Sequence, residues 1–163
     1  MTNYMFSNIF KKIVHAKSAL TTYNLGLLQA KAYRILKNKT SELLLTYNIS
    51  TIDWALIGLL LDKKEGLRFS EAALALGVEA PFVTVIVDIL EEKKIVSRHS
   101  SLTDKRSKTI ALTVNGKSLA LKIEHYLKKE TKFLVVGVSI SELIAYRKVL
   151  KAIIENSCES QQK

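Results

Sequence analysis

Asp104-Lys105-Arg106 lies in a seven-residue polar connection between two β-prone segments, residues 95–99 and residues 109–113. Two such segments joined by a short polar stretch predict a β-hairpin, and the tip of this hairpin carries two adjacent cations. A hairpin of this kind is typical of the wing of a winged-helix domain, which places cations against a DNA backbone or in a minor groove.

The residues before the hairpin have the pattern of a helix–turn–helix unit. Ser50 and Asp53 have the spacing of a capping box and predict the start of a helix. A short helix is predicted for residues 70–76, and a glycine follows it. Pro81 lies in the predicted first turn of the next helix, which runs to about Lys94, because a missing N–H is tolerated there. The sequence therefore predicts a mainly α fold, a winged helix–turn–helix with a small β-hairpin wing.

The chain has the length and composition of one folded domain. It contains 163 residues, of which 48% are hydrophobic and 25% charged, with no internal repeat or low-complexity linker. Its lone cysteine, Cys158, excludes an intramolecular disulfide and predicts no metal cluster. No apolar run approaches the ~18 residues of a membrane span, and no signal peptide is recognisable. We expect a single domain, residues 1–163, in the cytoplasm, with no cofactor, no metal and no membrane contact.

Long apolar stripes flank this central region on both sides. Apolar residues recur at helical spacing in residues 4–40, in residues 115–135 and in the final helix. Each stripe taken alone is compatible with burial inside one chain or between two chains. Long apolar segments at both chain ends favour a dimer interface. We expect a homodimer with dimerisation helices in residues 1–48 and 115–157, and a winged-helix lobe in residues 50–114.

The chain resembles the MarR-type winged-helix transcription regulators, by motif from Ser50 to Gly116 and by element order over its whole length. The matching segments are Glu71-Ala72-Ala73-Leu74-Ala75-Leu76-Gly77-Val78, Val83-Thr84, Val87-Asp88, Leu90-Glu91-Glu92-Lys93 and Asp104-Lys105-Arg106-x6-Thr113-x2-Gly116. The last segment, in the wing, is the specific part of the match. The resemblance implies a homodimer that binds palindromic double-stranded DNA and releases it when a small aromatic ligand binds.

The predicted recognition helix departs from that family. Relatives open this helix with a small polar residue, where this chain has Glu79. Phe82 and Val85 stand where relatives carry a hydroxyl and an arginine, and Lys94 stands where they carry a glycine. Thr84 remains as the side chain of this face that suits a base or a phosphate, because apolar groups at most touch a thymine methyl.

The distribution of charge also favours the wing over this helix. The net charge is +10, but residues 50–115 carry nine basic and nine acidic side chains. Between residues 69 and 92 there are five carboxylates and no lysine or arginine. The basic excess lies on the flanking helices, where a solvated face explains it. The residues that we predict to contact DNA are Thr84, Arg98, Lys105, Arg106 and Lys108.

In MarR-type proteins the effector lies between the long helices and the lobe, and the resemblance implies such a site here. The candidate residues have aromatic or imidazole rings with polar tips. They are His15, Tyr23, Tyr47 and Trp54. Trp54 is also explained as plain core, because it lies on the apolar stripe of its predicted helix.

No catalytic constellation is recognisable, and we do not expect an enzyme. The three histidines are far apart on different predicted elements, and there is no glycine-rich phosphate loop. Two functions stay open. The first is a dimeric, ligand-responsive, DNA-binding transcription regulator. The second is a winged-helix protein whose apolar and acidic recognition surface binds another protein. Solvent exposure of Phe82 and Val85 would favour the second function.

Overall fold

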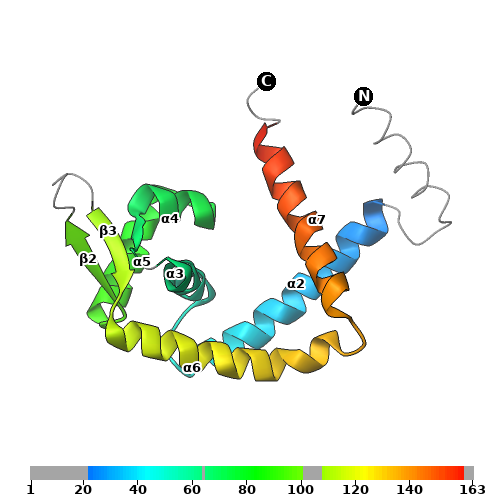
Figure 1. Ribbon diagram of the computed structural model, residues 1–163, viewed down its shortest axis with the longest axis horizontal. Coiled ribbons are helices and arrows are strands. Elements are labelled where there is room, and N and C mark those ends of the chain that lie inside the picture. Colours follow the sequence, from blue (N-terminus) through cyan, green and yellow to red (C-terminus); the bar gives the residue numbers. More distant parts are fainter. Residues whose placement is uncertain (1–21, 64, 101–107, 160–163) are drawn as a thin grey trace. The chain divides into compact units, whose positions relative to one another are not determined.

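The computed structural model describes residues 22–63, 65–100 and 108–159 (Figure 1). Its elements in chain order are α2 (Thr22–Leu45), α3 (Thr51–Asp62), β1 (Leu67–Arg68), α4 (Phe69–Leu76), α5 (Ala80–Glu92), β2 (Val96–Ser100), β3 (Lys108–Leu112), α6 (Val114–Thr131), the 3-10 helix η1 (Lys132–Val135) and α7 (Ile140–Glu159). This order confirms a mainly α winged helix with a small β-hairpin. The chain divides into two compact units, Met1–Leu127 and Lys128–Lys163.

The helix boundaries of the lobe follow local signals in the sequence. Ser50 and Asp53 form the predicted capping box, with Asp53 N 3.2 Å from the Ser50 hydroxyl and Ser50 N 2.9 Å from the Asp53 carboxylate. Helix α4 ends at Gly77, whose φ of 66° is left-handed and suits glycine. Pro81 lies in the first turn of α5. This helix ends at Glu92, two residues before the predicted end.

The sheet has three antiparallel strands in the order β1–β3–β2, so the hairpin carries a third strand that the sequence did not predict. Leu67 of β1 pairs with Ile110 of β3. Gly66 makes this approach feasible, because its φ is 79° and a Cβ there would lie 2.4 Å from the Ile110 carbonyl oxygen. The predicted hairpin segments are each shifted by one residue. Ile95 still donates to the Leu90 carbonyl at the end of α5, and Thr113 already caps α6.

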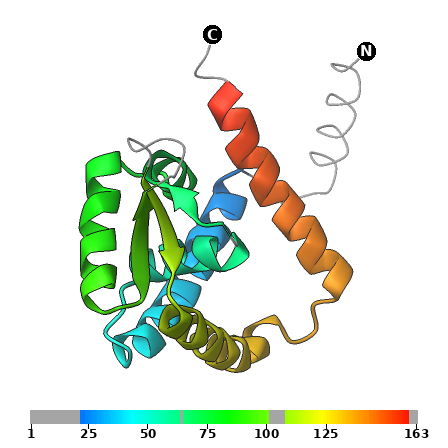
Figure 2. The same ribbon diagram turned by 60° about the vertical axis from the view of Figure 1, so that its left-hand side comes forward.

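One hydrophobic core holds the lobe together. It lies between α3, α4, α5, the sheet and the first turns of α6, with the last turn of α2 at its edge (Figure 2). Its largest fully buried side chains are Leu44, Leu56, Ile57, Ile86, Leu90, Ile110, Ile123, Val83, Val87 and Val96. Burial of these side chains is the main stabilising contribution, at roughly 1.5–3 kcal/mol for each.

The Thr113-x2-Gly116 motif joins the hairpin to α6. The Thr113 hydroxyl donates to the Lys94 carbonyl at 2.7 Å and accepts from Gly116 N at 2.9 Å. Gly116 lies so close to β2 that a Cβ would be 1.9 Å from the Ile95 carbonyl oxygen. The threonine caps the helix and the glycine allows close packing, which explains why the wing motif continues to this position.

Much of α2 and of α7 is exposed, including the apolar residues that the sequence predicted to be at a dimer interface. The exposed large hydrophobic residues of the two helices include Leu25, Leu27, Leu28, Ile35, Leu36, Leu143, Ile144, Val149, Ile153 and Ile154. In the second unit, Ser139 and Glu142 form the predicted capping box, 2.8 Å from Ser139 N to the Glu142 carboxylate. The Ser139 hydroxyl and then its backbone N–H hold the pKa of Glu142 below its usual value.

Candidate nucleic-acid interface

Helix α5 presents an apolar face to solvent at the position of a recognition helix. Val83, Ile86, Val87 and Leu90 are buried in the core. On the opposite side Phe82, Val85 and Ile89 are 46%, 51% and 40% exposed. The question that the sequence left open is therefore answered for both Phe82 and Val85: they are solvent-exposed and do not repack into the core.

Thr84 lies on the exposed side of α5, as predicted. Its hydroxyl oxygen lies 3.5 Å from the Ala80 carbonyl oxygen, one turn earlier in the helix. This is a long hydrogen bond for a hydroxyl, so the side chain can rotate to another acceptor at little cost. Thr84 is consequently the polar group on a face that is otherwise apolar.

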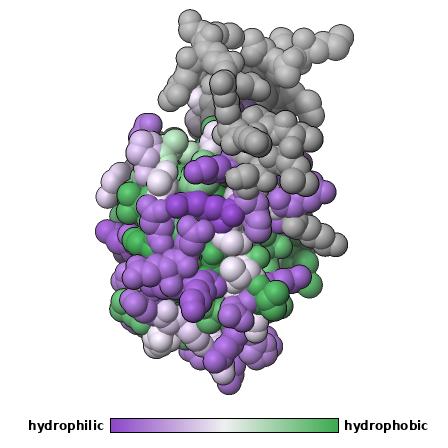
Figure 3. All heavy atoms as spheres, turned by 90° about the vertical axis from the view of Figure 1, so that its left-hand side faces the viewer, coloured by the Kyte–Doolittle hydropathy of each residue, from purple (hydrophilic) through white to green (hydrophobic). Residues whose placement is uncertain are grey.

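The wing consists of β2 and β3, and Val96 pairs with Leu112 at its base. Lys108 is exposed at the start of β3, opposite Ser100, and is placed to extend from the hairpin. Lys105 and Arg106 lie outside the described residues. Hydrophilic side chains occupy the centre of the molecular face at this end, and hydrophobic ones lie around them (Figure 3).

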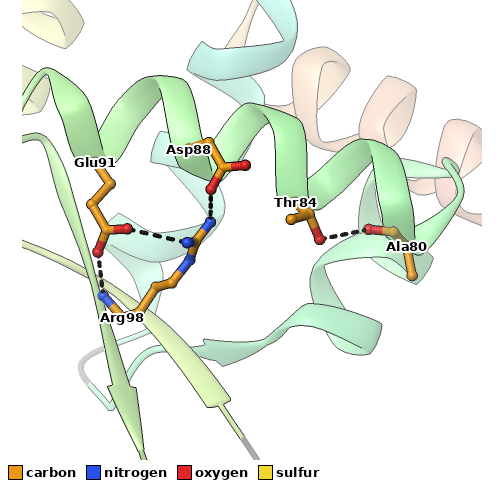
Figure 4. A network of polar contacts seen from close by, with 5 residues as sticks. All are labelled: Ala80, Thr84, Asp88, Glu91 and Arg98. Atoms are coloured by element: carbon orange, nitrogen blue, oxygen red, sulfur yellow. Dashed lines mark hydrogen bonds and ion pairs between the residues drawn. The ribbon is translucent and has the colours of Figure 1, made fainter.

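Arg98 of β2 binds two carboxylates of α5 (Figure 4). Its guanidinium forms an ion pair with Asp88, and its Nη1 lies 3.3 Å from the Glu91 carboxylate. The backbone N–H of Arg98 donates to the other oxygen of Glu91 at 3.2 Å. The guanidinium carbon also lies 5.7 Å from the centre of the Phe69 ring.

These contacts give Arg98 a structural role that the sequence prediction did not include. Its side chain is only 28% exposed, and it joins the wing to the recognition helix. Asp88 and Glu91 lie three residues apart and so share one helix face, which is the local signal that points to a common partner. The partner lies on another element, and single-sequence reasoning did not find it. A phosphate would have to compete with two carboxylates for this guanidinium.

The segment between α5 and β2 is held in a tight turn. Lys94 has a left-handed φ of 58°, a conformation that glycine adopts most readily. This accounts for the glycine that the resemblance leads us to expect at this position. Lys93 donates from Nζ to the backbone carbonyl of Asn48. Both lysines therefore lie beside the wing, and Lys93 is engaged within the lobe.

The predicted effector residues do not converge on one described hollow. Tyr47 and Trp54 are partly buried against the core, and Lys122 Nζ lies 5.7 Å from the centre of the Tyr47 ring. Tyr23 is 77% exposed on α2, and His15 lies outside the described residues. A groove of about 380 Å³ between α2 and α3 is lined by other residues, among them Tyr33. Partial burial of Trp54 agrees with its alternative interpretation as core.

Two further searches concern the described part of the chain. Within it, no group of three or more His, Cys, Asp and Glu side chains could hold a metal ion. None of its helices taken singly has the length and apolar composition of a membrane span, whereas α4 and α5, which meet at a bend of 105°, satisfy those criteria as a pair.

A helix–turn–helix with a β-hairpin wing is the architecture of a winged-helix DNA-binding protein. No protein-family model matches the sequence. Solved structures of transcriptional regulators do match its fold. A MarR-family regulator from Rhodococcus sp. RHA1 is 20% identical, with 83% of this chain and 96% of that one covered and a TM-score of 0.72. S. aureus MepR in its DNA-binding conformation is 25% identical, with 83% and 98% covered and a TM-score of 0.72.

CouR from Rhodococcus jostii RHA1, in a structure bound to p-coumaroyl-CoA, is also similar. It is 20% identical, with 83% of this chain and 95% of that one covered and a TM-score of 0.75. The fold of this chain is that of the MarR-family transcriptional regulators, as the resemblance in the wing motif predicted. The alignment extends beyond the lobe, since 83% of the chain is more than the lobe alone contains.

Proposed function

We propose that this chain is a homodimeric transcription regulator that binds double-stranded DNA mainly through its wing. The fold match to MarR-family regulators carries this proposal. The recognition helix contributes less, because α5 exposes Phe82, Val85 and Ile89 where base readout needs hydrogen-bonding groups. Lys105, Arg106 and Lys108 are the cations that we assign to DNA. Arg98 supports them by holding the wing on α5.

The DNA-binding proposal is tested by a mobility shift of the full chain on DNA from upstream of its own gene, with scrambled DNA as competitor. We expect a shift with a specific-to-nonspecific ratio at or below about 10³, the low end for specific binders. Sharply sequence-specific binding, well above this ratio, would mean that α5 reads bases despite its apolar face. Absence of any shift at low salt would remove DNA binding from the proposal.

Dimerisation through the terminal helices is the second part of the proposal. It is supported by the exposed apolar side chains of α2 and α7. Light scattering after size exclusion should give about twice the chain mass of 18.3 kDa at micromolar concentration. Deletion of residues 1–30 should give a monomer or an aggregate. A folded, monodisperse monomer from the full chain would exclude this interface.

We further propose that a small aromatic effector regulates DNA binding. The support is a relative's structure, that of CouR bound to p-coumaroyl-CoA. The candidate residues stay His15, Tyr23, Tyr47 and Trp54. Simple aromatic acids, added to the mobility shift one at a time, test this part. Release of DNA by one of them, weakened by Tyr47→Ala, would support the site.

A second function is favoured by one specific observation, the exposure of Phe82 and Val85 on α5. In this alternative the recognition surface binds another protein. A wing that holds DNA leaves the apolar face of α5 free for such a partner, so the two functions are compatible. Phe82→Ala would then abolish the partnership and leave DNA affinity unchanged.

A further inference from the structure

An open apolar groove of about 400 Å³ runs beside the exposed face of α5. Phe82, Val85 and Ile89 line it from α5. Leu45 at the end of α2 and Ile52 in the first turn of α3 also line it. Three elements of the lobe thus converge on one hollow, and each contributes at least one large apolar side chain.

The groove is a surface that the fold leaves uncovered. Leu45 is 72% exposed, beside three α5 side chains that are each at least 40% exposed. The core is complete without them, because the opposite side of α5 already fills the lobe. Contiguous apolar side chains of this kind mark interaction sites on folded proteins.

Carboxylates stand at both ends of the apolar stripe of α5. Five lie between residues 69 and 92, and three of them are engaged: Glu71 caps α4, while Asp88 and Glu91 hold Arg98. The side chains of Glu79 and Glu92 have no hydrogen bond or ion pair with any described residue. Glu79 precedes Phe82 by three residues and Glu92 follows Ile89 by three, so both share the face of the stripe.

The free carboxylates define the charge and length of a matching ligand. Thirteen residue steps separate Glu79 from Glu92, which is about 20 Å along a helix. Lys93, which also lines the groove, donates its Nζ to the Asn48 carbonyl and is directed away from that role. A ligand therefore meets apolar surface in the middle and a negative charge at each end.

We propose that this groove binds an amphipathic α-helix of a partner protein, with an apolar stripe flanked at each end by lysine or arginine. The proposal specifies the partner for the second function above and does not depend on DNA binding. Apolar side chains spaced along a helix suit a helix laid in a groove. An added β-strand would need a free sheet edge, and the groove is lined by helices and a turn. DNA is disfavoured, because phosphates would meet Glu79 and Glu92.

Binding of labelled peptides to the full chain tests the proposal by fluorescence anisotropy. The probe is a leucine–lysine peptide of about 14 residues, long enough to span the groove as a helix. One control peptide has the same composition in scrambled order, and another replaces each lysine with glutamate. We expect a micromolar Kd for the probe and at least about tenfold weaker binding of both controls. Because the whole chain carries +10, nonspecific attraction of a cationic peptide is unfavourable.

Variants locate the binding. Val85→Asp should weaken the probe by at least about tenfold, while Val114→Asp, at an 88% exposed valine outside the groove, should leave it unchanged. Glu79→Lys with Glu92→Lys should weaken the leucine–lysine probe and strengthen the leucine–glutamate peptide. Circular dichroism of each variant checks the fold, and the surface charge reversal keeps the test decisive if Val85→Asp unfolds.

Several outcomes would overturn the proposal. They are no binding by the wild type, equal binding of the scrambled peptide, and equal effects of Val85→Asp and Val114→Asp. A loss of half the mass by light scattering in Val85→Asp alone would make the groove an interface between two copies, which also contradicts a partner helix. Mobility shifts with the same proteins report DNA binding separately, so failure of one function is not mistaken for failure of the other.

Discussion

The wing and the recognition helix are joined by a tight turn, yet they present opposite kinds of surface. The wing sequence is basic around residues 105–108, whereas the exposed face of α5 is apolar with a free carboxylate at each end. In a MarR-type fold both elements are expected to meet DNA. Here only one of them has the chemistry for phosphates. Fold and surface chemistry therefore separate within one small lobe, and each has to be assigned from its own residues.

The largest expected effect comes from removing the charge of the wing. Replacing Lys105 and Arg106 with alanine removes four cations from a dimer. The slope of log affinity against log salt should fall by roughly 3–4 units, at ~0.9 per lost phosphate contact. Mobility shifts at several salt concentrations measure it.

The matched control for the wing is Arg147→Ala with Lys148→Ala, which removes the same charge from α7. This control should leave the slope nearly unchanged. Equal slopes for the wing variant and the wild type would place the phosphate contacts elsewhere, and the contrast between wing and helix would lose its functional meaning.

A smaller effect is expected from giving α5 the chemistry that it lacks. Glu79→Ser with Val85→Arg removes one repulsive charge and adds one base-reading group. Each good base contact contributes about 1–3 kcal/mol of discrimination, so affinity for specific DNA should rise about tenfold or more. Val114→Arg adds the same charge outside this face and should raise affinity for all DNA sequences alike. If both variants behave alike, α5 does not enter the major groove.

The smallest effect is expected at the contact between the two regions. Arg98→Met keeps the apolar stem but leaves Asp88 and Glu91 without their partner. Because these carboxylates are 57% and 40% exposed, we expect a loss of only about 1 kcal/mol in the free energy of unfolding. Thermal denaturation measures it, as a fall in Tm of a few degrees.

A double-mutant cycle assigns that loss to the ion pair. Asp88→Asn in the Arg98→Met background should have less effect than Asp88→Asn in the wild type. Additive effects would mean that Arg98 stabilises the lobe through its packing on Phe69 alone.

Local sequence signals predicted most of the fold. The capping boxes at Ser50 and Ser139, Pro81 in the first turn of α5 and the glycine after α4 all mark boundaries that lie within a few residues of one another along the chain. Strand β1 was missed because two residues carry no pattern. Its pairing depends on the close approach of Gly66 to β3, a contact across more than 40 positions.

The site was harder to predict, for a physical reason. Helix α5 is apolar on almost every side, so periodicity alone did not indicate which residues face the core. Only packing shows that Val83 and Ile86 are inside while Phe82 and Val85 are outside. The charge of Arg98 was visible in the sequence, but its two partners lie seven and ten residues earlier on another element.

The contact of Gly116 with Ile95 has a mechanical consequence. The first turn of α6 is fixed to the base of the wing by a capped threonine and by a glycine that leaves no gap. Helix α6 has 18 residues and is about 27 Å long, so it acts as a rigid arm with its pivot at the wing. A tilt of the arm by a few degrees would move its far end by a few ångströms while the near end turned the hairpin with it. Leverage of this kind converts a small displacement of the hairpin into a larger one at the end of α6, and the reverse path would turn both wings of a dimer together.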